Sequence, residues 1–305
     1  MCNLSNPIYH DKDKAREHLE SIRWPDGPIC PHCGVVGNAK EMQGKAHRPG
    51  LYKCRDCRKQ FSVTVGTVFE RSKVPLNKWL LATHLLTSSK KGISSHQIHR
   101  SLGVTYKTAW FMTHRIRCAM ESTDTTPLGS GGGIVEADEA YIGHKKGYTK
   151  KQAGSGHKMK IFSLVERGGK VKSKSIPGNI FDGIKLGLTN VSPDAHLMTD
   201  QATMYRNVGK KFASHEAVNH SIKEWVRGNV HTNTVEGFFS IFKRGMKGVY
   251  QHCSEDHLQR YLAEFDFRYN NRVALDINDS ERCRIALEGI GGKRLTYRQP
   301  LISYS

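Results

Sequence analysis

Hydrophobic residues recur at helical spacing in the first part of the chain. Residues 10–24 make one short amphipathic segment, and residues 75–121 continue the periodicity, with breaks at Lys91–Gly92 and at Gly103. Apolar positions three and four residues apart are typical of helices that bury one face, and glycine interrupts such helices. The pattern therefore predicts an N-terminal helix and, after a segment rich in Pro, Gly and Cys, three consecutive helices.

The pattern changes after residues 123–133, a Ser-, Thr- and Gly-rich linker that is the clearest domain boundary in the chain. Beyond it, short apolar runs predict strands at 134–138, 159–166 and 195–199. Gly168–Gly169 predicts a hairpin turn, and the spacing from Thr234 to about Asn271 is mostly helical. Strands and helices in one segment predict a mixed α/β domain.

The charge balance narrows the class of partner. The 305 residues include 47 Lys and Arg against 28 Asp and Glu, a formal net charge of +19. Such a charge repels itself and favours a polyanion, nucleic acid before an anionic membrane. No run of about 18 apolar residues predicts a transmembrane helix, and the N-terminus lacks an apolar signal core. We therefore expect a cytoplasmic, nucleoid-associated protein in a reducing compartment.

Four cysteines form two CxxC pairs, at Cys30 and Cys33 and at Cys54 and Cys57. Each CxxC turn presents two thiolates on one side of a tight knuckle, and two knuckles complete a tetrahedral Zn²⁺ site. The alternatives, four unrelated thiols or a redox pair, account less well for two matched pairs. The spacing therefore predicts one structural Zn²⁺ in a zinc ribbon.

The three predicted helices of 75–121 match a helix-turn-helix. A short capped helix ends at Gly103, and the next helix opens with polar residues. In this motif the start of the second helix faces DNA. A plain helical bundle is the alternative reading, and the basic charge favours DNA. The residues expected to contact DNA are Thr105, Tyr106, Lys107, Thr108 and Arg115.

Three segments can bring acidic residues together. Asp138 lies on the first predicted strand, Asp200 ends another, and Glu236 lies near the start of the long helix. About 100° per residue places Asn233, Glu236, Ser240 and Lys243 on one face of that helix. Two Mg²⁺ ions about 4 Å apart can catalyse phosphodiester cleavage, and Mg²⁺ prefers a few carboxylates plus water and phosphate. Any one acid alone is more often a turn residue or a cap.

At these residues the sequence resembles the bacterial insertion-sequence DDE transposases that join a zinc ribbon to an ISXO-like catalytic domain, relatives of the eukaryotic Merlin transposases. The matching stretches are CPHC…YKCRDC with QFSVTVGTVFE, VEADEAYIG, LMTDQATMY and the long run that starts at HTNTVEGFFSIFKRG. The resemblance implies an RNase H-like fold, recognition of terminal inverted repeats, and strand cleavage and transfer that depend on Mg²⁺ or Mn²⁺.

The resemblance also implies residue roles and domain limits. Asp138 and Asp200 correspond to the first two catalytic acids and Glu236 to the third, with Asn233 as the alternative third residue and Lys243 as the associated basic residue that could hold a phosphate. Glu139, His231 and Asn233 are expected beside these ligands. The expected parts are an N-terminal helix (1–24), a zinc ribbon (25–70), a helix-turn-helix (75–122), a linker (123–133), an RNase H-like catalytic domain (134–290) and a C-terminal tail (291–305).

Two other functions remain open from the sequence. A regulator that uses only the zinc ribbon and the helix-turn-helix would bind DNA without cutting it. A nuclease or resolvase-like enzyme of the same fold would cut without joining. A transposase must hold two DNA ends together, so we expect at least a dimer on double-stranded DNA.

Overall fold

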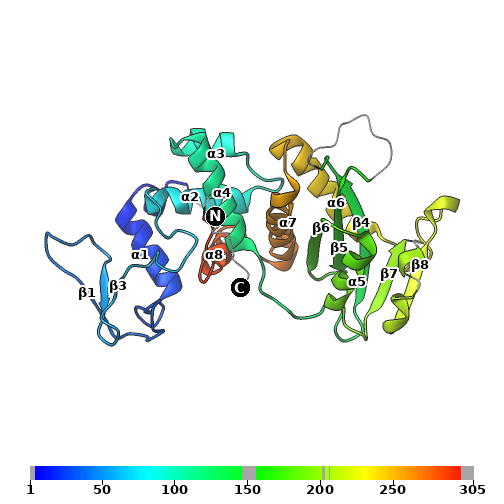
Figure 1. Ribbon diagram of the computed structural model, residues 1–305, viewed down its shortest axis with the longest axis horizontal. Helices are drawn as coiled ribbons and strands as arrows, with labels where there is room; N and C mark the ends of the chain where they lie inside the picture. The colour runs from blue at the N-terminus through cyan, green and yellow to red at the C-terminus, as the bar shows by residue number, and fades with distance from the viewer. Residues whose placement is uncertain (1–3, 146–155, 201–202, 206, 297–305) are drawn as a thin grey trace, which may run out of the picture. The chain divides into compact units, whose positions relative to one another are not determined.

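The computed structural model describes residues 4–145, 156–200, 203–205 and 207–296 (Figure 1). The chain forms two compact units. Unit 1 combines Met1–Glu121 with Val273–Ser305, and unit 2 is Ser122–Arg272. Unit 2 is therefore inserted between two segments of unit 1.

Unit 1 begins with a helix beside a small sheet. Helix α1 (Lys12–Arg23) starts at Asp11, whose carboxylate accepts two backbone N–H groups, the arrangement that stabilises a helix start. The sheet is antiparallel and ordered β1-β2-β3, with strands Ala39–Glu41, Tyr52–Cys54 and Gln60–Phe61. Trp24 packs edge-on against Tyr52 and Phe61. The three rings supply an apolar core where the segment is otherwise polar.

Three helices follow as the periodicity predicts: α2 (Leu76–Ser88), α3 (Ser95–Leu102) and α4 (Tyr106–Met120). Ser94 and Thr105 cap α3 and α4 through their hydroxyls. Gly103 ends α3 at φ 58°, in the left-handed region that glycine enters without steric cost. Local capping and a glycine turn thus define the α3–α4 pair.

Helix α8 (Asp279–Glu288) belongs to unit 1. It buries Cys283, Ala286 and Leu287, and Arg282 donates to the backbone carbonyl of Thr87 at the end of α2. The expected catalytic domain ran to residue 290, whereas the second unit ends at Arg272. The difference arises because the apolar face of α8 packs against α2 rather than the sheet.

Unit 2 contains a five-stranded mixed sheet. The strands are β4 (Ile134–Ile142), β5 (Met159–Glu166), β6 (Val171–Ile176), β7 (His196–Asp200) and β8 (Ser214–Val218). Their order is β6-β5-β4-β7-β8 (Figure 1). Strands β4, β5 and β6 are antiparallel, and β7 and β8 run parallel to β4. This mixed sheet confirms the predicted RNase H-like fold class.

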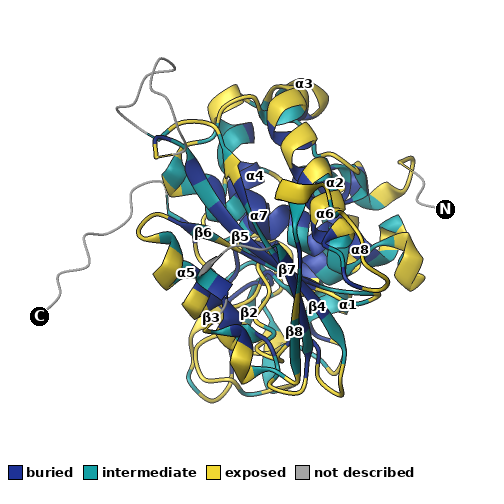
Figure 2. Cartoon of the chain, turned by 90° about the vertical axis from the view of Figure 1, so that its right-hand side faces the viewer, coloured by how far each residue is buried: buried dark blue, intermediate teal, exposed yellow. Residues whose placement is uncertain are grey.

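Helices cover both faces of this sheet. On one face, α6 (Asn233–Gly245) and α7 (Glu255–Asn270) pack on a core that includes Ala140, Ile161 and Phe242. On the other face, α5 (Ile180–Gly187) packs with Ala137, Phe162 and Leu197. The central strands are consequently buried (Figure 2).

Short turns complete the described chain. They are the 3-10 turns Pro7–Tyr9, Leu188–Asn190, Thr203–Tyr205, Gly209–Lys211, His220–Ile222 and Val273–Leu275, and the π-helical turn Met246–Tyr250.

Candidate functional site

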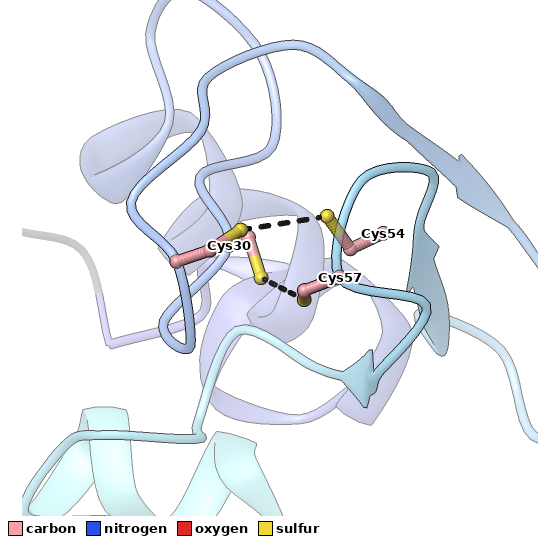
Figure 3. Close-up of side chains that lie close together, drawn as sticks. Cys30, Cys54 and Cys57 are labelled. Carbon is pink, nitrogen blue, oxygen red and sulfur yellow. Dashed lines mark hydrogen bonds between the residues drawn. The ribbon is translucent and has the colours of Figure 1, made fainter.

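The four cysteines of the two CxxC pairs converge on one point in unit 1. All four sulfur atoms lie within 4.8 Å of one another. The Sγ–Sγ distance is 3.6 Å between Cys30 and Cys57 and 3.7 Å between Cys33 and Cys54. A tetrahedron with Zn–S bonds of about 2.3 Å has S–S edges of about 3.8 Å. The cluster therefore fits Zn²⁺, and Figure 3 shows the side chains of Cys30, Cys54 and Cys57 turned inward.

The backbone explains why the thiols converge. The residue after each CxxC pair, Gly34 or Arg58, has positive φ, 79° and 60°. The N–H of Cys30 donates to the carbonyl of Val35, and the N–H of Cys54 donates to the carbonyl of Lys59. Two similar tight turns therefore face each other, as a zinc ribbon requires.

In unit 2, alternation along β4 sorts its acidic residues onto two faces. Ala140 packs in the core beneath α6, and Ala137 packs in the core beneath α5. Successive side chains of a strand point to opposite faces. Glu136 and Asp138 therefore face α6, and Glu139 faces the α5 side.

Glu136 binds the first turn of α6. Its side chain is fully buried and accepts from the backbone N–H groups of Thr234 and Val235 at 2.7 and 3.0 Å. These N–H groups lie in the first turn and have no carbonyl partner within the helix, so a carboxylate beside them is stabilised by the helix dipole. The contact fixes the start of α6 against the strand that carries Asp138.

Arg167 balances the charge of Glu136. Its Nε lies 2.6 Å from a Glu136 carboxylate oxygen, and its other nitrogens donate to the backbone carbonyls of Asn229 and His231. The Nδ1 atom of His231 lies 3.2 Å from the same carboxylate. His231, expected beside the catalytic acids, thus belongs to this Glu136–Arg167 network.

Asp200 lies at the end of β7, next to β4 in the sheet. The two strands are parallel, with Ile134 opposite His196 and Glu136 opposite Met198. Continuing this register brings Asp200 level with Asp138. Adjacent strands thus carry the two aspartates at the same height.

Helix α6 presents a polar face as its spacing predicts. Asn233, Glu236, Ser240 and Lys243 are exposed, whereas Val235, Phe238, Phe239 and Phe242 are buried. Thr232 donates to the Glu236 carboxylate at 2.8 Å. The buried face holds the helix on the sheet, and the exposed face displays Glu236 in its first turn.

Electrostatics show that these acids act on one another. Burial, together with the charges of Glu139, Asp200 and Glu236, raises the pKa of Asp138 to about 8, although a hydrogen bond from the backbone N–H of Glu139 opposes the shift. Burial likewise raises the pKa of Glu139 to about 7, although a hydrogen bond from Tyr205 opposes the shift. Carboxylates that repel one another across a site are characteristic of functional centres.

The spacing of the acids differs from that of the cysteines. Within the described ranges, the cysteines are the only set of three or more His, Cys, Asp or Glu residues whose ligand atoms all lie within 4.8 Å of one another. A centre for two ions about 4 Å apart needs ligands spread around both ions. The wider acidic set is compatible with that arrangement.

The predicted DNA-contacting residues divide between surface and core. Thr105, Tyr106 and Lys107 are exposed at the start of α4, and Thr108 is partly buried. Arg115 is buried instead: it donates to the carbonyls of Glu70 and Leu295 and stacks on Phe111. The structure corrects the assignment of Arg115, because two carbonyls and a ring already hold its guanidinium.

Glu136 and Arg167 were missed by the sequence reasoning. The one available signal was a charged residue on the inward face of an apolar strand, which is rare without a partner.

Glu136→Ala should destabilise the protein by about 3–5 kcal/mol, because it leaves Arg167 and the helix start without their counter-charge. Urea unfolding measures this loss. Glu216→Ala, at an exposed site, is the control, and equal stabilities of the two variants would contradict the assigned role.

None of the described helices is long and apolar enough to cross a membrane.

Comparison with known families matches both units. The model of the transposase zinc-ribbon domain matches residues 10–60, and that of the ISXO2-like transposase domain matches residues 131–270. Together the matched segments make up more than half of the chain. The chain is also 29% identical over 273 residues to an uncharacterized protein in transposable element ISH50 of Halobacterium salinarum, covering 84% of this chain and 90% of that protein. The chain therefore belongs to the insertion-sequence transposases that combine a transposase zinc ribbon with an ISXO2-like transposase domain.

Proposed function

We propose that this transposase binds the terminal inverted repeats of its own element, cleaves the DNA strands there and joins the ends to target DNA. The observation that carries the proposal is the proximity of Asp138 on β4 to Asp200 on β7 and Glu236 on α6, whose charges both raise the pKa of Asp138. Asp138 gains little from packing at this position, because burial and like charge both oppose its ionisation. A bound cation relieves both costs.

Asp138, Asp200 and Glu236 would hold Mg²⁺, or Mn²⁺ in its place. The donor set suits these ions, which prefer carboxylate oxygens. When bound, two such ions activate the attacking hydroxyl and stabilise the leaving oxyanion. Glu236 is our choice for the third acid over Asn233 because its charge acts on Asp138. Lys243, exposed farther along the same face, would bind a DNA phosphate.

Unit 1 supplies the proposed DNA recognition. Thr105, Tyr106 and Lys107 stand exposed at the N-terminal end of α4, where helix-turn-helix proteins contact base edges. Exposed basic residues lie near the zinc-site cysteines in the sequence and suit the phosphate backbone: Lys45, His47, Arg48, Lys53, Arg55, Arg58 and Lys59. We also propose that at least two copies act together on DNA, since two ends must be joined in one reaction.

The decisive experiment combines purified protein, Mg²⁺, DNA carrying the sequences that flank the gene, and a supercoiled target. A transposase nicks the flanking DNA and joins it to the target. Binding without metal-dependent nicking would identify a regulator instead, and nicking without joining would identify a nuclease.

Metal binding should depend on pH. The pKa of Asp138 in the metal-free protein is about 8, so a proton occupies this carboxyl at lower pH and competes with Mg²⁺. Because the metal displaces that proton, Mg²⁺ affinity should rise up to about tenfold per pH unit toward pH 8 and then level off. Titration calorimetry at several pH values measures this slope. Asp138→Asn should flatten it, and an unchanged slope in that variant would assign the proton to another group.

A further inference from the structure

The segment between β8 and α6 borders the acidic site. It follows Val218, which pairs with Asp200 in the parallel β7–β8 register, and it ends at Thr232, the cap of α6. Because parallel strands end at one edge of a sheet, the segment starts beside Asp200. It then leads to the helix turn that carries Glu236. In Figure 1 it follows the strand labelled β8 at the edge of the sheet.

This segment carries an exposed tryptophan. Trp225 is 55% exposed, whereas Trp24 and Trp79 are buried and Trp110 is partly buried. Ile222 and Val226 beside it in the sequence are exposed as well. The exposed part of a large apolar ring gains no hydrophobic free energy on folding, so this group of exposed apolar side chains is expected to contact a ligand.

His220 connects this tryptophan to the acidic site. The rings of His220 and Trp225 lie 4.5 Å apart at an interplanar angle of 35°. The Nε2 atom of His220 lies 3.9 Å from a carboxylate oxygen of Glu236. The indole therefore stands one side chain away from a proposed metal ligand, within the length of a nucleotide.

The chemistry around Trp225 favours a nucleobase over an apolar protein surface. Two exposed cationic residues, Lys223 and Arg227, lie two positions before and two positions after Trp225 in the sequence, and Arg227 also contacts Glu224 at 3.4 Å. Single-stranded nucleic acid is bound where aromatic rings stack on bases and cations follow the phosphates. An aromatic ring with flanking cations provides both features.

We propose that Trp225, backed by His220, is a stacking platform for an unpaired nucleobase of the DNA strand held at the acidic site. The inference rests on the proposed function for the identity of that strand. A base taken out of the duplex costs unstacking energy, which a stacking platform offsets. Trp225 would thus favour the opened DNA end over the intact duplex.

The test uses the full-length zinc-loaded protein and a short oligothymidylate, in the absence of Mg²⁺ so that no cleavage occurs. Stacking should quench the tryptophan emission, and the quench should be absent from Trp225→Phe. Trp225→Leu should weaken binding about 5- to 150-fold, measured by fluorescence anisotropy. Trp225→Phe, which keeps an aromatic ring, should retain most of the affinity.

The matched probe is an abasic oligonucleotide of equal length, which has the phosphates but no bases. Its binding should be the same for the wild type and for Trp225→Leu. The stacking role would be overturned if Trp225→Leu lost affinity equally for the oligothymidylate and the abasic probe. It would also be overturned if Trp225→Leu bound the oligothymidylate as tightly as the wild type does. Sedimentation that shows a dimer in the wild type and a monomer in Trp225→Leu would also overturn it and assign the patch to a second copy of the chain.

Two outcomes separate this inference from the proposed function. Base-dependent binding that needs Trp225, in a protein that never cuts its flanking DNA, would reject the transposition reaction and keep the platform. Cleavage by the wild type, with normal oligothymidylate binding by Trp225→Leu, would reject only the platform.

Discussion

Asp138→Asn and Asp200→Asn should each lower Mg²⁺-dependent cleavage of the element's DNA by about 10³-fold or more, while binding of the same DNA stays within a few fold. Each change keeps the shape of the side chain and removes the negative charge that would bind metal under the proposed function. When catalytic residues act as one unit, replacing any one of them removes most of the activity. The cleavage rate of the double variant should therefore be little lower than that of either single variant. Gel analysis of end-labelled DNA measures the rate.

Matched variants sharpen this test. Glu216→Gln removes one exposed carboxylate of β8 and should leave the cleavage rate unchanged. Glu236→Gln and Asn233→Ala separate the two candidates for the third residue, since only the first removes a charge that acts on Asp138. We expect Glu236→Gln to be the more damaging. Full cleavage by Asp138→Asn together with Asp200→Asn would show that the acidic set is not the catalytic centre.

The second large effect concerns the cysteine cluster. Cys54→Ser should release the zinc and unfold the ribbon segment, because Cys54 is fully buried and links the metal site to β2. Structural zinc contributes about 10–16 kcal/mol in small domains, far more than a core of three aromatic rings provides. Amide exchange should therefore rise throughout β1, β2 and β3, and metal analysis should find less than one zinc per chain.

Cys253→Ser is the matched control, because this cysteine lies in unit 2 outside the cluster. It should keep one zinc and normal exchange in the ribbon. A chelator should reproduce the effect of Cys54→Ser on the wild type. Protected amides in β1–β3 after complete removal of zinc would contradict the structural role of the metal.

The features that sequence reasoning found were those encoded locally. Two CxxC pairs predict their own geometry, because each turn is set by neighbouring residues. The amphipathic face of α6 follows from helical spacing, which places Glu236 opposite Phe238 and Phe242. The glycine turn at Gly103 and the hydroxyl cap of α4 are likewise readable over a few residues.

The features that it missed depend on distant partners. In the sequence, nothing distinguishes Glu136 from the other acidic residues near Asp138. Its role is visible only in the fold, which brings Arg167 and the start of α6 to its carboxylate. Arg115 is a residue type that often contacts DNA, yet its guanidinium donates hydrogen bonds to the carbonyls of Glu70 and Leu295. Strand β8 is too short to show alternation. No local pattern indicates that α8 packs with α2 rather than with the sheet.

The insertion of unit 2 between two segments of unit 1 also constrains how the protein is made. During synthesis the ribosome releases the whole of unit 2 before it releases α8, so the second unit can complete its core while α2 still lacks its partner helix. The proposed DNA-recognising unit is then the last to mature. A nonsense or frameshift mutation shortly after Arg272 would yield a chain with every proposed catalytic acid but an unfinished unit 1.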